Sequence, residues 1–131
     1  MPKFDVQKKR TRINVFKLGK IYVLKQFFDD KEIFKGLVDY YNSDSYRFEM
    51  KSVGARNKVM WFLEMEGGFD TYIIEDPSDF MVIIDKDKKY ADILKNSVDH
   101  RVTKDARIFI MKDMAAVEEA ISLGAEKYEG S

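Results

Sequence analysis

The acidic stretch of residues 64–87 holds the side chains best suited to metal binding or acid–base chemistry. It contains eight acidic residues and one lysine, which gives a formal charge of −7. Converging carboxylates can bind Mg²⁺ or Ca²⁺, and a carboxylate pair can act as acid and base. If the chain is such an enzyme, the positions to inspect first are Asp76, Asp79 and Asp85. Aspartate is also favoured in turns and helix caps for local reasons, so we predict neither a catalytic residue nor a metal site here.

The basic N-terminal segment is the second candidate for chemistry. Residues 1–25 contain eight basic residues and one acidic residue, a formal charge of +7, although the whole chain has a net charge of zero. Cations interleaved with aromatic rings can bind single-stranded nucleic acid through its phosphates and bases. A glycine turn at residues 52–58 adds two cations that could face a phosphate. The residues that would bind nucleic acid or another anion are Lys8, Lys9, Arg10, Arg12, Arg56 and Lys58.

Both charged segments also fit a simpler interpretation. Surface charges of either sign are normally solvated, and the basic and acidic segments could equally face each other within the fold. The aromatic residues near the basic segment fall where a core needs apolar area. We therefore favour solvated charge over nucleic-acid binding, which remains the alternative function.

Several chemistries are excluded by composition. The chain has no cysteine, so a thiol nucleophile, a cysteine-ligated zinc and an Fe–S cluster are impossible. His100 is the only histidine, which excludes a two-histidine metal site within one chain. The neighbouring Asp99 gives no catalytic dyad, because adjacent residues of an extended segment point in opposite directions. No nucleophile-elbow serine or phosphate-binding glycine motif is present, and we predict no cofactor.

Length and hydropathy place the chain among single-domain proteins of the cytoplasm. Its 131 residues, 45% of them hydrophobic, suit one domain with a conventional core. No apolar run is long enough to span a membrane, and the N-terminus lacks the apolar core of a signal peptide. We expect a cytoplasmic protein with no membrane partner.

The first half of the sequence predicts a strand-rich region around one helix. Residues 12–18 and 21–24 predict a β-hairpin closed by Gly19 and Lys20. An apolar stripe predicts a helix over about 30–42, in which Gly36 would allow close packing on a sheet. Three further strands are expected from alternating or apolar runs and from a glycine-pair hairpin signal, at 46–51, 59–63 and 69–74.

The second half alternates strands and helices. The apolar run at 80–84 predicts a strand, and a helix follows over about 87–97. Residues 99–106 give no clear pattern. A strand at 107–111 then precedes a helix that Asp113 caps and Gly124 ends.

Together these elements predict an α+β fold, with a mainly antiparallel sheet of five or more strands covered on one face by about three helices. Residues 1–11 form a basic, partly mobile arm, 12–124 a single α+β domain, and 125–131 a frayed C-terminus. The function we predict is a non-enzymatic binding or protein-interaction module. A protein partner or a homodimer would dock at a sheet edge, for which residues 45–53 are the best candidate.

Overall fold

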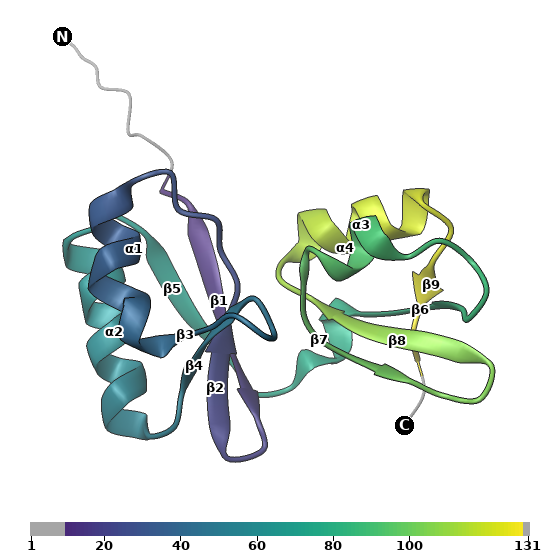
Figure 1. Ribbon diagram of the computed structural model, residues 1–131, viewed down its shortest axis with the longest axis horizontal. Coiled ribbons are helices and arrows are strands. Elements are labelled where there is room, and N and C mark those ends of the chain that lie inside the picture. The colour runs from purple at the N-terminus through teal and green to yellow at the C-terminus, as the bar shows by residue number, and fades with distance from the viewer. Residues whose placement is uncertain (1–9, 130–131) are drawn as a thin grey trace, which may run out of the picture.

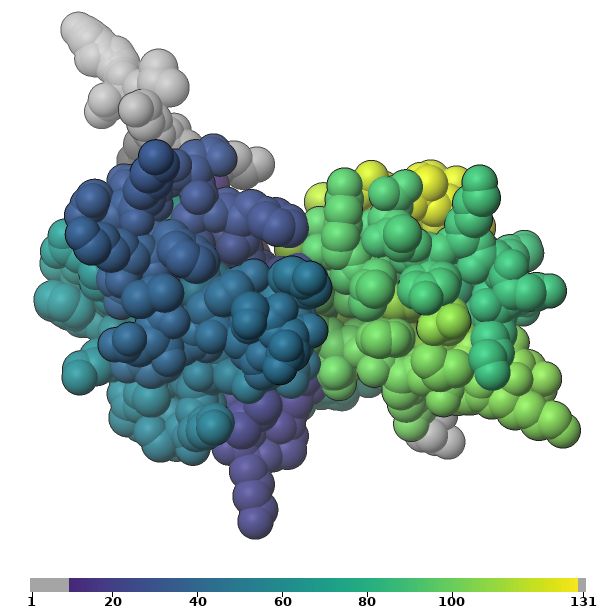
Figure 2. Space-filling view, viewed as in Figure 1, coloured from purple at the N-terminus to yellow at the C-terminus, as the bar shows by residue number. Residues whose placement is uncertain are grey.

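A computed structural model describes residues 10–129 (Figure 1). The fold is α+β, as predicted, but the strands form two mostly antiparallel sheets instead of one. We call residues 10–75 the first half and residues 76–129 the second half; Figure 2 shows them side by side, the first in purple to teal and the second in green to yellow.

The first sheet belongs to the first half and has the strand order β3-β4-β2-β1-β5. Its strands are β1 (Arg12–Leu18), β2 (Ile21–Leu24), β3 (Tyr41–Asn42), β4 (Arg47–Met50) and β5 (Asp70–Ile74). The helices of this half are α1 (Lys31–Leu37), the short 3₁₀ helix η1 (Val38–Tyr40) and α2 (Val53–Met65). The pair β1–β5 is parallel and the other pairs of this sheet are antiparallel.

The second sheet is antiparallel and has the order β7-β8-β6-β9. Its strands are β6 (Met81–Asp85), β7 (Ser97–Val102), β8 (Ala106–Met111) and β9 (Glu126–Lys127). The helices of this half are the 3₁₀ helix η2 (Pro77–Phe80), α3 (Ala91–Leu94) and α4 (Met114–Ser122). In Figure 1, α3 and α4 lie together over one side of this sheet.

Several predicted elements are confirmed. The β1–β2 hairpin forms, and Gly19 at its turn has a φ of +63°, a left-handed conformation that glycine adopts without strain. β6 and β8 occupy the two apolar runs of the second half. Asp113 caps α4 as expected, because its side chain accepts a hydrogen bond from the backbone N–H of Ala116 at 2.8 Å.

The predicted strand at 59–63 is wrong, because these residues belong to helix α2. Ser52 caps the helix by accepting a hydrogen bond from the backbone N–H of Ala55. Val59 and Leu63, four residues apart, are the buried positions of the helix, which is the spacing of one helical face. The apolar run alone does not distinguish a buried strand from part of a helix.

The predicted hairpin at Gly67 and Gly68 is also wrong. The backbone N–H of Gly67 donates to the carbonyl of Leu63 at the end of α2, and Gly68 has a φ of +71°. The glycines therefore end a helix, as glycine commonly does. The strand that follows, β5, pairs in parallel with β1.

Two predicted helices differ in extent, and one strand was not predicted. The predicted helix over 30–42 is α-helical only to Leu37. Gly36 in it packs on α2 instead of a sheet, because a Cβ at this position would clash with the Phe62 ring. The predicted helix over 87–97 shortens to α3, and residues 97–102, largely unassigned from sequence, form β7.

Two predictions about edges and ends also change. β4 hydrogen-bonds to β2 on one side and to β3 on the other, so residues 45–53 are not a free sheet edge. A homodimer stays a prediction, but residues 45–53 do not offer it a free edge for docking. Glu126 and Lys127, which we expected in a frayed C-terminus, form β9 and pair with β6.

The first sheet is buried on both faces. On one face, Ile13, Val15 and other residues pack under α1 and α2. On the opposite face, Phe16 and Val23 join the core of the second half, and the Phe16 ring meets the Phe80 ring edge to face at 5.2 Å. The two halves thus share a continuous core, which fixes their relative position.

Candidate ligand-binding site

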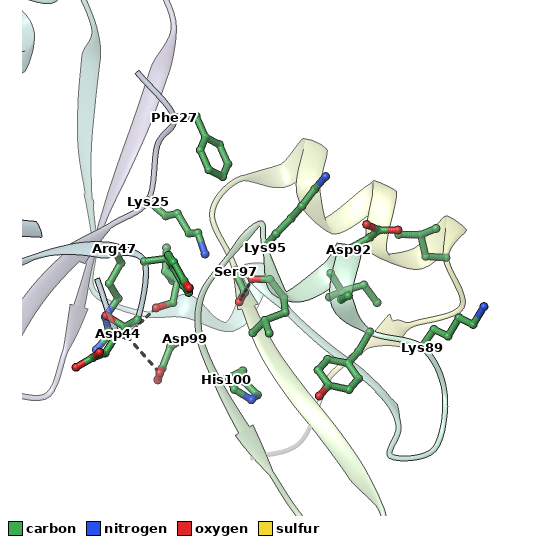
Figure 3. Close-up of a pocket in the computed structure, with 18 of the residues that line it drawn as sticks. Lys25, Phe27, Asp44, Arg47, Lys89, Asp92, Lys95, Ser97, Asp99 and His100 are labelled. Carbon is green, nitrogen blue, oxygen red and sulfur yellow. Dashed lines mark hydrogen bonds and ion pairs between the residues drawn. The ribbon is translucent and has the colours of Figure 1, made fainter. Parts of the chain in front are cut away.

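A cleft of about 1230 Å³ lies where the two halves meet (Figure 3). The first half contributes the end of β2 and the turn between β3 and β4. The second half contributes the loop after β6, α3, the start of β7 and the end of α4. Pockets for small molecules usually measure about 300–1000 Å³, so this cleft can hold one.

Lys25 is the most unusual residue of the cleft. It directly follows β2, and strand alternation places it on the same face as Val23, toward the second half, as Figure 3 shows. Only 8% of its surface is exposed. No hydrogen bond or ion pair joins it to another residue of the described range 10–129. Most of the Lys25 side chain is thus covered, while its amine opens into the cleft, because the one fully buried side-chain nitrogen or oxygen without a partner among residues 10–129 is Arg107 Nε.

The pKa of Lys25 is lowered from its ordinary value of 10.5. Burial is the main cause, and the positive charge of Arg47 adds to it. Val23 pairs with Glu49 and Leu24 with Phe48, so the same antiparallel register places Lys25 opposite Arg47. Like charges at opposed positions of a sheet repel each other, which favours an uncharged Lys25 amine.

Arg47, by contrast, has three partners. Its guanidinium forms an ion pair with Glu49 at 2.7 Å, donates to the carbonyl of Val98 at 2.7 Å, and pairs with Asp99 at 3.3 Å. Val98 and Asp99 belong to β7, so Arg47 also joins the two halves beside the cleft.

The Glu49 carboxylate is held ionised by the same network. Burial alone would raise its pKa, but hydrogen bonds from Arg47, Asn42 and Ser45, together with the Arg47 charge, leave the pKa lower than usual. Glu49 therefore balances the charge of Arg47 and leaves none for Lys25.

The walls of the cleft are largely apolar. They include Phe27, Tyr90, Leu94 and Leu123. Phe27 is 64% exposed, so much of its ring is free to contact a ligand. Tyr46 also lines the cleft and has a φ of +56°, an outlier for a bulky residue of the kind that concentrates at functional sites.

Charged residues of both signs surround these walls. The lining contains five basic residues and four aspartates. His100 lies there too, and its ring stacks on Phe109 at 5.3 Å. Asp99 pairs with Arg47, so no contact makes His100 and Asp99 a catalytic dyad within the described residues.

The structure describes four of the six predicted anion-binding residues and does not bring those four together. Lys8 and Lys9 lie outside the described residues. Arg10 pairs with Asp70 at 3.0 Å, and the Arg12 guanidinium lies 3.9 Å from the centre of the Tyr72 ring, both at the β5 edge.

Arg56 and Lys58 lie toward the other end of the first sheet. Arg56 sits over the ring of Tyr22, whose strand partner on β1 is Lys17. Lys17 is five residues from Arg12 on β1, which is about 17 Å along a strand, so Arg56 lies far from Arg12. Lys58 is exposed on α2. The four of these residues that the structure describes do not form one patch, and nucleic-acid binding stays a prediction.

The carboxylates of the enzyme hypothesis do not line the cleft. Asp76 and Asp79 belong to the exposed η2 region and Asp85 ends β6. Hydrogen bonds from the Ser78 side chain and backbone lower the pKa of Asp76, which is a local capping arrangement. Within residues 10–129, no group of three or more histidine or acidic side chains is placed to hold a metal ion.

The sequence analysis missed Lys25 as a site residue. The signal was present: Ile21, Val23 and Lys25 alternate along one face of β2, so a lysine occupies an inward position. The role of this lysine in a cleft had no local signal, because the opposite wall of the cleft comes from residues more than 60 positions later in the chain.

Comparisons with protein-family models, curated proteins and solved structures found no match to this chain. None of the helices described in residues 10–129 combines the length and the apolar character needed to cross a membrane.

Proposed function

We propose that this protein is a non-enzymatic binding module that holds a small, mostly apolar molecule in the cleft between its two halves. The observation that carries the proposal is Lys25, whose mostly covered side chain brings an amine without a partner among the described residues to a large cleft with apolar walls. Small-molecule sites typically combine such walls with a few polar groups that orient the ligand.

The balance of charge favours an uncharged ligand. Arg47 is neutralised by Glu49 and Asp99, and the basic residues and aspartates of the lining are nearly equal in number. An anion would meet several carboxylates, and a cation would meet Lys25. A neutral molecule with one oxygen acceptor directed at Lys25 avoids both costs.

The neutral fluorescent probe phenylnaphthylamine tests this proposal. We expect it to bind the folded protein at one site with increased emission. Phe27→Ala removes an aromatic wall and should weaken binding roughly tenfold, or about 1.4 kcal/mol. Trp61→Ala is the matched control, because Trp61 is 61% exposed on α2 and does not line the cleft.

The two variants decide between the cleft and other surfaces. Equal loss of binding in both variants, or no binding by the native protein, would overturn the proposal. Circular dichroism of each variant confirms that it is folded, because partly unfolded proteins also bind apolar dyes.

A further inference from the structure

The amine of Lys25 has the surroundings of a nucleophilic lysine. An amine attacks a carbonyl carbon only when it is uncharged, and proteins favour that form by removing water from the amine or by placing another cation beside it. Lys25 has both features: most of its side chain is buried at the cleft, and the register of β2 and β4, continued by one residue, places Arg47 beside it.

Within residues 10–129, no hydrogen bond or ion pair involves the Lys25 amine. Glu49 and Asp99, the acids beside Arg47, both bind its guanidinium. Ser97, at the start of β7, donates its hydroxyl to the carbonyl of Leu94. The lowered pKa of Lys25 increases the uncharged fraction of this amine, and the lone pair of that form can attack a carbonyl carbon.

We propose that Lys25 captures an aldehyde in the cleft as a reversible imine. The inference rests on the proposed function and specifies its ligand as a small apolar aldehyde. Such a molecule is neutral, as the charge balance of the cleft requires, and its carbonyl is the one polar group that Lys25 needs. The apolar remainder of the molecule would lie against Phe27, Tyr90 and Leu94.

The reaction needs no oxidant, reductant or metal. The Lys25 nitrogen lone pair forms a C–N bond to the carbonyl carbon, and the carbonyl electron pair moves to oxygen, which takes up a proton. The resulting carbinolamine loses its hydroxyl group as water, and both hydrogens of that water derive, in net terms, from the amine. The C=N bond replaces the C=O bond, and hydrolysis reverses the step.

Reductive trapping tests the inference on the full chain. The protein is incubated at neutral pH with naphthaldehyde, and cyanoborohydride supplies the hydride that converts the imine into a stable secondary amine. Peptide mass spectrometry then locates the adduct. We expect it mainly on Lys25, with far less on the exposed lysine Lys95, which also lines the cleft.

Three variants separate a reactive Lys25 from general lysine chemistry. Lys25→Met and Lys25→Arg should both lose most of the adduct, and the second keeps a basic residue at the position. Lys95→Met should retain it. Phenylnaphthylamine should compete with adduct formation, which places the reaction in the cleft.

The outcomes distinguish this inference from the proposed function. Adducts spread over many lysines, or retained in both Lys25 variants, would overturn the imine. If the native protein binds phenylnaphthylamine but forms no Lys25 adduct, the cleft remains a binding site and the covalent step is wrong. If the probe does not bind at the cleft, the proposed function fails as well.

Discussion

Lys25 is less favourable as a cation in the folded protein than in the unfolded chain. Burial and Arg47 lower its pKa in the folded state from the ordinary 10.5. The unfolded chain therefore binds this proton more tightly. Below the folded-state pKa the destabilisation is fully present, and it is relieved as the pH rises from that pKa toward 10.5. The effect of this lysine on stability is therefore opposite in sign to that of a lysine stabilised by an acid.

Lys25→Met should consequently raise the free energy of unfolding at neutral pH. The gain over the native protein should shrink as the pH approaches 10.5, because the native amine then loses its proton in the unfolded chain too. Urea unfolding at a series of pH values measures it. Lys20→Met, at the exposed β1–β2 turn, controls for the lost charge. A gain that grows with pH would contradict the assigned cause.

Among the elements, α2 is the one whose identity the local sequence left ambiguous. Residues 59–63 suit a strand by their apolar character, yet Ser52 begins a helix that buries Val59 and Leu63 against the first sheet. Trp61 and Met65 are consequently left on the exposed side of this helix. The element thus depends on its cap and on its packing surface together.

Ser52→Ala tests the helix directly. The substitution removes the hydroxyl that accepts from the backbone N–H of Ala55 at 3.0 Å and should cost about 1 kcal/mol. Ser43→Ala, at an exposed position in the β3–β4 turn, should change little. Thermal or urea unfolding of both variants provides the measurement. Equal stability of the two variants would remove Ser52 as the cap of α2.

The whole molecule depends on a core that crosses between the halves. Phe16 and Val23 project from the first sheet into the cluster that contains Val82 and Phe109 of the second sheet. A buried asparagine, Asn14, adds a hydrogen bond to the carbonyl of Lys112 at 3.1 Å. This shared core holds the two walls of the cleft at a fixed separation.

Phe16→Ala should therefore destabilise both halves together, by about 3–5 kcal/mol. We expect one cooperative unfolding transition, and hydrogen exchange should accelerate for the amides of β1 and β8 alike. Trp61→Ala, at an exposed site, provides the control. Faster exchange confined to the first sheet would show two independent units, contrary to the single domain predicted over 12–124.

The sequence by itself determined the α+β class, the β1–β2 hairpin, the strands β6 and β8 and the helix α4. Each of these depends on local signals: alternation, an apolar run between turn residues, or a capping aspartate. It also excluded cysteine and paired-histidine chemistry, because composition is independent of folding.

Only the tertiary structure decided the division into two sheets, the parallel β1–β5 pair, the helical state of residues 59–63 and the cleft itself. Pairing over a long separation and burial against a distant element have no local signature. Lys25 illustrates the difference: its inward position follows from alternation along β2, whereas its lack of a partner among the described residues depends on Arg47, Glu49 and Asp99 pairing with one another.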